Sequence, residues 1–88
     1  MGRALGLIET IGFVTAVEAA DAAHKAAHVH MIRKYENAEA GLITIQLRGE
    51  LAAVQAAVDA GAQAARRIGQ LVSALVIPNP DDDLDEFF

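Results

Sequence analysis

Residues 42–68, LITIQLRGELAAVQAAVDAGAQAARRI, set the architecture, because they combine a strand and a long helix with almost no connection between them. Leu42–Leu47 is β-branched and apolar, which predicts a strand that ends before Arg48. Apolar side chains at helical spacing predict an amphipathic helix with one apolar face, formed by Leu51, Val54, Ala57, Val58, Ala62, Ala65 and Ile68. Gly61 interrupts this helix and allows a close backbone approach, and Gly69 is expected to end it.

The residues before and after this stretch continue the alternation of strands and helices. Ala4–Thr10 is short and apolar and predicts a buried strand. Phe13–Ala27 predicts a helix, with an apolar stripe at Phe13, Ala16, Val17, Ala20, Ala23 and Ala27. Val29–Tyr35 predicts a second strand, and the turn formers in residues 36–41 fit a hairpin loop. Leu71–Ile77 predicts the last strand, which Pro78-Asn79-Pro80 ends.

The predicted order is β-α-β-β-α-β, which is typical of an α+β, ferredoxin-like domain with one antiparallel sheet and two helices on one of its faces. One domain is expected over residues 4–80, followed by an acidic C-terminal tail over residues 81–88. Composition predicts that the tail is a disordered segment. The Phe87-Phe88 end leaves a second alternative, a short helix that packs on the sheet.

Composition points to association between copies. A chain of 88 residues buries only about 60% of its unfolded surface, yet 53% of these residues are hydrophobic. The excess of small apolar side chains therefore predicts a subunit interface. The chain has no cysteine, which excludes disulfides and thiolate metal sites.

Charge argues against two classes of partner. The tail contains five acids, Asp81, Asp82, Asp83, Asp85 and Glu86, which account for the whole net charge of −5. The remaining body is neutral, and we therefore expect no nucleic-acid binding, which needs clustered basic residues. No apolar run approaches the roughly 20 residues of a membrane span, so no membrane association and a cytoplasmic location are expected.

Catalysis has weak support from the residues. No Ser or Cys nucleophile lies in a recognisable setting, and we expect no catalytic residue, cofactor or metal. His24 and His28, four residues apart, could bind a metal together with Asp21, but a solvated helix face is the favoured interpretation. Two alternatives to a structural protein stay open at this level: a ferredoxin-like ligand-binding or regulatory oligomer, and a metal-dependent enzyme subunit.

Nine short runs in unbroken order across residues 4–80 form a recognisable set: Gly6–Thr10, Gly12-Phe13, Val17–Ala22, Lys25–Ala27, Gly41–Thr44, Arg48–Glu50, Ala53-Val54, Ala56–Gly61 and Val76–Pro80. Together they resemble the bacterial microcompartment (BMC) shell domain. The single-domain length is similar to that of the class that forms hexamers rather than tandem-domain trimers.

The resemblance implies a structural function in a bacterial microcompartment shell in the cytoplasm. Family members form six-fold discs that tile edge to edge around metabolic enzymes. The implied partners are five further copies of the chain, other shell hexamers, trimers and vertex pentamers, and the enclosed enzymes.

The resemblance also implies a central pore, lined by the loop Asn37, Ala38, Glu39, Ala40 and Gly41. Related members often have Lys-Ile-Gly-Ser-Gly there, so this loop differs at its first four positions. Six copies of Glu39 would form a carboxylate ring that favours cations and neutral molecules such as an amino alcohol or a diol. In the alternative, Glu39 points away from the axis and Ala40 forms the constriction.

At the edge of the discs, the family places a lysine antiparallel to its mate across a two-fold axis, and Lys25 matches it. His28 stands where the family usually has an asparagine, and Asn79 where it has an arginine between two prolines. Because histidine changes charge near neutral pH, His28 would add pH sensitivity to this contact.

Overall fold

The computed structural model describes residues 3–37 and 40–87. Its elements confirm the predicted order and the α+β class: β1 (Ala4–Ile11), α1 (Phe13–Ala26), β2 (His30–Asn37), β3 (Leu42–Gly49), α2 (Leu51–Ile68), β4 (Gln70–Ile77) and a 3-10 helix, η1 (Asp82–Phe87). Within the described residues, no helix is both long enough and apolar enough to cross a bilayer.

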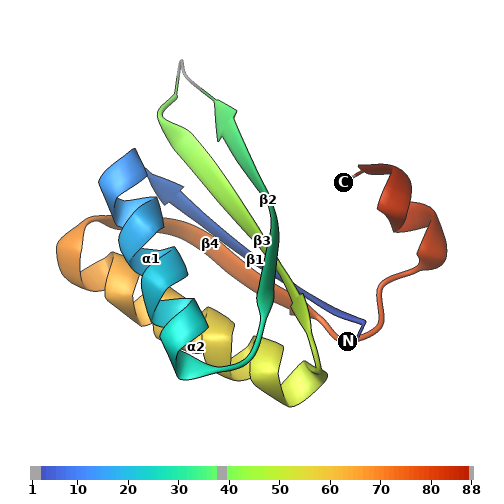
Figure 1. Ribbon diagram of the computed structural model, residues 1–88. Helices are drawn as coiled ribbons and strands as arrows, with labels where there is room; N and C mark the ends of the chain where they lie inside the picture. The colour runs from blue at the N-terminus through green and yellow to red at the C-terminus, as the bar shows by residue number, and fades with distance from the viewer. Residues whose placement is uncertain (1–2, 38–39, 88) are drawn as a thin grey trace.

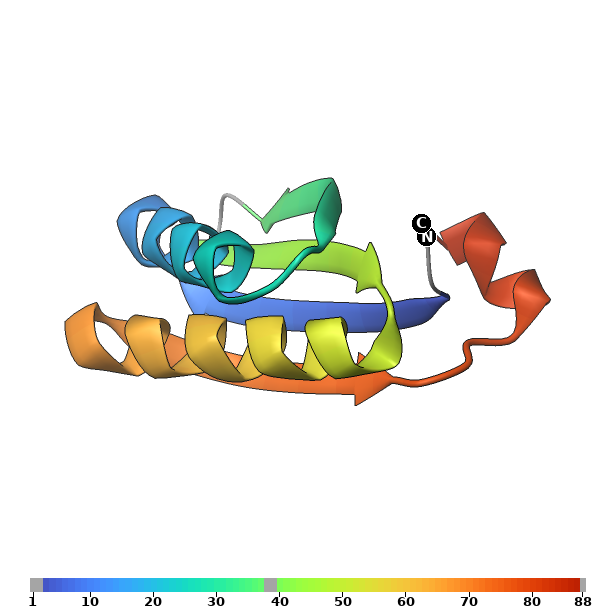
Figure 2. The ribbon, with the colours of Figure 1, turned by 60° about the horizontal axis from the view of Figure 1, so that its bottom comes forward.

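The four strands form one antiparallel sheet in the order β2-β3-β1-β4. Both helices pack on the same face of this sheet, as predicted (Figures 1 and 2). We call the opposite face the open face. β2 and β4 are the two edge strands, so the sheet has two unlike flanks.

β3 extends beyond the predicted end at Leu47. Arg48 and Gly49 stay in the ladder because they pair with Leu5 and Ala4 of β1. Gly49 also leaves room for the segment that connects α1 to β2. An added Cβ at residue 49 would lie 3.2 Å from the His28 carbonyl oxygen in that segment. The strand therefore ends only at Gly49, and the next residue, Glu50, is the N-cap of α2.

The core lies between the helices and the sheet. Ile8, Ile45 and Leu47 are fully buried sheet residues, and Val54 and several alanines cover them from the helices. Gly61 confirms the expected close approach, because an added Cβ would lie 2.6 Å from Ile8 Cδ1 and 2.9 Å from the Ala19 carbonyl oxygen. Small residues thus bring α1, α2 and β1 into direct contact.

The predicted buried face of α1 is partly wrong. Its buried residues are Thr15, Ala16, Ala19 and Ala23, whereas Phe13 and Val17 are 55% and 48% exposed. The interface with α2 is too close for large side chains, so the helix turns its alanines inward. Alanine therefore occupies the positions that a hydropathy pattern assigns to larger residues.

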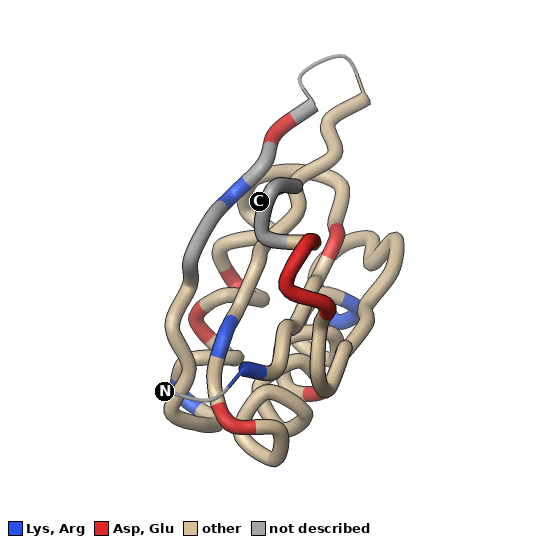
Figure 3. Tube along the Cα trace, turned by 90° about the vertical axis from the view of Figure 1, so that its right-hand side faces the viewer, with Lys and Arg blue, Asp and Glu red and all other residues tan. Residues whose placement is uncertain are grey.

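The end of the chain is tied to its beginning. The tail forms a short 3-10 helix, η1, as one of the two alternatives expected, but this helix lies beyond the end of the sheet and does not pack on its face (Figures 1 and 2). Arg3 donates from Nη2 to the Pro80 carbonyl oxygen at 2.9 Å and to Asp82 Oδ1 at 2.7 Å. Figure 3 shows the acids at the start of the tail as a continuous red segment, while Lys and Arg are scattered over the body.

Candidate assembly surfaces and pore segment

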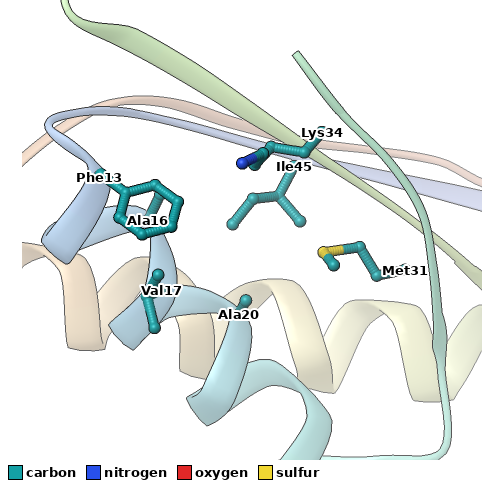
Figure 4. Close-up of a pocket in the computed structure, with 7 residues that line it drawn as sticks. All are labelled: Phe13, Ala16, Val17, Ala20, Met31, Lys34 and Ile45. Carbon is teal, nitrogen blue, oxygen red and sulfur yellow. The ribbon is translucent and has the colours of Figure 1, made fainter. Parts of the chain in front are cut away.

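One flank of the molecule is an apolar surface beside β2, which we call the α1 flank. Its exposed large side chains are Phe13, Val14, Val17 and Met31. A groove of about 280 Å³ opens here between α1 and the strands β2 and β3, lined by Phe13, Ala16, Val17, Ala20, Met31, Lys34 and Ile45. Figure 4 shows these side chains facing a common space.

Among the side chains that the structure describes, Lys34 is the one charged residue that lines the groove. Its Nζ lies 4.8 Å from the centre of the Phe13 ring and 2.9 Å from Glu36 Oε1. The cation–π contact and the ion pair satisfy this ammonium group at the side of an apolar groove. The groove can therefore accept an apolar surface without leaving an unpaired cation beneath it.

The other flank is also apolar and lies across the sheet, so we call it the β4 flank. Its exposed large side chains come from α2 and β4: Leu51, Ile68, Val72 and Leu75. Because β2 and β4 are opposite edges of the sheet, the two flanks face away from each other. One chain thus carries two different apolar surfaces that it cannot bring together itself.

The predicted pore segment forms the connection between β2 and β3. Asn37 is the last residue of β2, Ala40 is exposed, and Gly41 has a φ of +70°. The Gly41 carbonyl oxygen accepts a hydrogen bond of 2.9 Å from the amide of Gly12, whose φ is +92°. Ala38 and Glu39 lie outside the described residues. The two glycines join the hairpin connection to the start of α1.

The predicted edge residues occupy three separate settings. Lys25 lies in the last turn of α1, where its Nζ forms a 2.7 Å ion pair with Asp21 Oδ2. The hydrogen bond that Lys25 Nζ donates to Asp21, and then the negative charge of Asp21, raise the pKa of Lys25 above the usual value of 10.5. Asn79 Oδ1 accepts a hydrogen bond of 3.1 Å from Arg3 Nε, so its amide is used within the chain.

The structure contradicts the histidine arrangement that the metal-site alternative required. α1 ends at Ala26 and Ala27 is extended, so His28 does not share a helix face with His24. His28 instead lies edge-to-face with His30, with 5.4 Å between ring centroids, and His24 Nδ1 is 2.7 Å from the Ala20 carbonyl oxygen. Among the described residues, no three His, Asp or Glu side chains cluster as metal ligands.

Two polar contacts were not anticipated from the sequence. Arg3 contacts residues 79–82, and Thr44 Oγ1 donates a hydrogen bond of 2.8 Å to Glu9 Oε2 on the open face. Each joins residues far apart in the chain. Only the strand register, which places Glu9 opposite Thr44, could have revealed the second.

The fold and its flanks define a small α+β assembly module, and comparisons with known proteins identify its family. A family model described as the BMC domain matches residues 4–80. The chain is 53% identical to the bacterial microcompartment shell protein EutM of Salmonella typhimurium over 86 residues, covering 98% of this chain and 88% of that protein. It is 48% identical over 84 residues to the shell protein PduA of Citrobacter freundii, covering 96% and 89%.

Two further relatives extend the comparison. The carboxysome shell protein CsoS1 of Prochlorococcus marinus is 50% identical over 86 residues, covering 97% of this chain and 82% of that protein. The crystal structure of a microcompartment protein from Desulfitobacterium hafniense superposes with a TM-score of 0.88 at 34% identity. That match covers 98% of this chain and 48% of the other, so this chain spans about half its length.

The chain belongs to the BMC-domain family of microcompartment shell proteins. This membership gives it a structural rather than a catalytic role, and it decides against the enzyme alternative.

Proposed function

We propose that the chain forms cyclic hexamers that tile into the shell layer of a bacterial microcompartment. The observation that carries this proposal is the pair of unlike apolar flanks on opposite edges of the sheet. A contact between the α1 flank of one copy and the β4 flank of the next leaves a free flank at each end. Every flank of every copy is covered by a neighbour only when the row of copies closes into a ring.

Light scattering tests ring formation directly. A hexamer has a mass of about 56 kDa, six times the 9.3 kDa of one chain. Electron microscopy of the same preparation should show discs joined into sheets or tubes. A chain that remains a monomer at micromolar concentration would contradict the proposal.

The edge of each disc is proposed to include Lys25, with His28 and Asn79 nearby in the assembled layer. Lys25 is exposed over 76% of its side chain, and its pairing with Asp21 holds it in one orientation at the end of α1. An oriented ammonium group at an exposed helix end can donate to carbonyl oxygens of an adjoining disc.

The loop Asn37, Ala38, Glu39, Ala40 and Gly41 is proposed to line the central pore. A carboxylate ring of six Glu39 residues would favour a cationic or neutral small molecule, such as an amino alcohol or a diol, over an anion. The neutral body of the chain supports this selectivity, since no basic cluster is available to attract anions.

The proposed setting is the shell of a compartment in the bacterial cytoplasm. The relatives' names, shell protein EutM, shell protein PduA and carboxysome shell protein CsoS1, support it. Other shell proteins and the enclosed enzymes would then be the partners of the hexamer. No cofactor is part of this function.

A further inference from the structure

Glu9 is a carboxylate on the open face of the sheet. Gly6 faces α2, where an added Cβ would meet Val54 and Val58, and Ile8 lies in the core between helices and sheet. Strand residues alternate between the two faces, so Leu7 and Glu9 of β1 point to the open face. Glu9 is half-buried there, which leaves part of its side chain in contact with solvent.

The side chain of Glu9 is held in place by its neighbour on β3. Thr44 Oγ1 donates a hydrogen bond of 2.8 Å to Glu9 Oε2, and the two residues are register partners. On the other side, Glu9 is the register partner of Ser73 on β4, which is exposed. Among the described residues, no Lys, Arg or His forms an ion pair with Glu9. The carboxylate is therefore positioned by a neutral partner rather than by a cation.

Glu9 lies on the part of the open face that leads to the pore segment. It pairs with Thr44, three positions from Gly41, which corresponds to about 10 Å along the strand. The hydrogen bond between the Gly12 amide and the Gly41 carbonyl oxygen closes this end of the sheet. The acidic tail is attached at the opposite end of β1, next to Arg3, so the two acidic regions are separate.

We propose that six copies of Glu9 form a second carboxylate ring at the open-face entrance of the pore, and that this ring selects cations over anions before they reach the loop. The proposal rests on the hexamer and pore proposed above. A six-fold rotation axis near residues 37–41 would repeat Glu9 six times around the axis, on the open-face side of the disc. Charges of one sign that line a concave entrance concentrate counter-ions and repel co-ions.

The test measures ion selectivity of the discs. Sheets of discs are sealed across an aperture in a solid support, and the reversal potential in a KCl gradient gives the ratio of cation to anion permeability. Glu9→Gln is expected to lower this ratio by about threefold, since it removes six negative charges and keeps the hydrogen bond from Thr44. Glu50→Gln is the matched control, because Glu50 is an exposed acid at the opposite end of the sheet, next to Gly49, which pairs with Ala4.

A second variant keeps the test independent of any folding defect at position 9. Ser73→Lys changes an exposed residue and places an ammonium group across from Glu9, so it should also lower the ratio. The proposal is overturned if discs with Glu9→Gln show an unchanged permeability ratio. If that variant does not fold, an unchanged ratio in discs with Ser73→Lys overturns it instead. An equal loss in Glu50→Gln discs overturns it too, because the effect would then be one of net charge. These outcomes differ from failure of the hexamer itself, which light scattering detects before any selectivity is measured and which overturns both proposals.

Discussion

Arg3 and Asp82 are 79 positions apart in the chain, yet Nη2 of one lies 2.7 Å from Oδ1 of the other. The same guanidinium binds the Pro80 carbonyl oxygen and Asn79 Oδ1, and Arg48 Nη1 donates to the Arg3 carbonyl oxygen. The N-terminal strand and the acidic tail are thereby fastened together at one end of the sheet.

Replacing Arg3 should release the tail without unfolding the domain. Arg3→Gln is expected to speed amide hydrogen exchange in residues 82–87 while the melting temperature changes little, because exposed ion pairs contribute about 0–1 kcal/mol. High salt should have the same effect on the unmodified chain. Asp83→Asn, which removes an exposed charge not bound to Arg3, serves as the control. Equal exchange rates in Arg3→Gln and the unmodified chain would show that the tail is held by other contacts.

Gly61→Ala should destabilise the domain. Alanine would normally improve a helix interior by about 1 kcal/mol, but the added Cβ would lie 2.6 Å from Ile8 Cδ1 and 2.9 Å from a backbone oxygen of α1. Overpacking of this kind costs about 1–3 kcal/mol, which urea unfolding of the variant should detect. Ile8→Val removes one of the two clashing atoms, so the double variant should be less destabilised than the sum of the single changes. Additive effects would mean that the two positions do not touch.

The two flanks can be tested by paired substitutions. Val17→Asp on the α1 flank and Leu75→Asp on the β4 flank each place a charge in a proposed interface, and each should yield folded monomers by circular dichroism and light scattering. Each variant retains the flank that the other has lost. An equimolar mixture should therefore form dimers with one intact contact but no rings.

The outcome of mixing distinguishes the proposed head-to-tail contact from its alternative. If contacts joined identical flanks, each variant alone would still form dimers through its intact flank. Leu51→Asp at the start of α2 offers a second change on the β4 flank, should Leu75→Asp fail to fold.

Lys25→Ala is expected to leave hexamers intact and to abolish extended sheets. The Lys25 side chain is exposed at the end of α1 and belongs to neither the α1 flank nor the β4 flank. Ring closure should therefore not need it. Size-exclusion chromatography should give an unchanged hexamer, and electron microscopy should show single discs. Arg67→Ala, an exposed basic residue in the last turn of α2, is the matched control. Sheets that persist without Lys25 would refute its place at the disc edge.

The pairing of Lys25 with Asp21 should be visible in its titration. The pKa of Lys25 is raised in the folded chain, so its ion pair with Asp21 loses none of its stabilising contribution to lysine deprotonation below pH 10.5, the usual pKa of a lysine. This contribution is lost as the pH rises through the raised pKa of the folded chain. Asp21→Asn should move the pKa of Lys25 back toward 10.5, as measured by NMR of the lysine Nζ or Cε resonances. A pKa that does not move would mean that Asp21 does not bind Lys25 in solution.

Local patterns were sufficient for the order of the strands and helices, the close approach at Gly61 and the concentration of acids in residues 81–86. Such features depend on residues that are near one another in the chain, where strand and helix periods can be read directly. The inward face of α1, the hydrogen bond between Glu9 and Thr44, and the pairing of Arg3 with Asp82 became known only from the folded chain. Each of these depends on strand register or on how closely two helices pack, and both arise from contacts between segments that no local period relates.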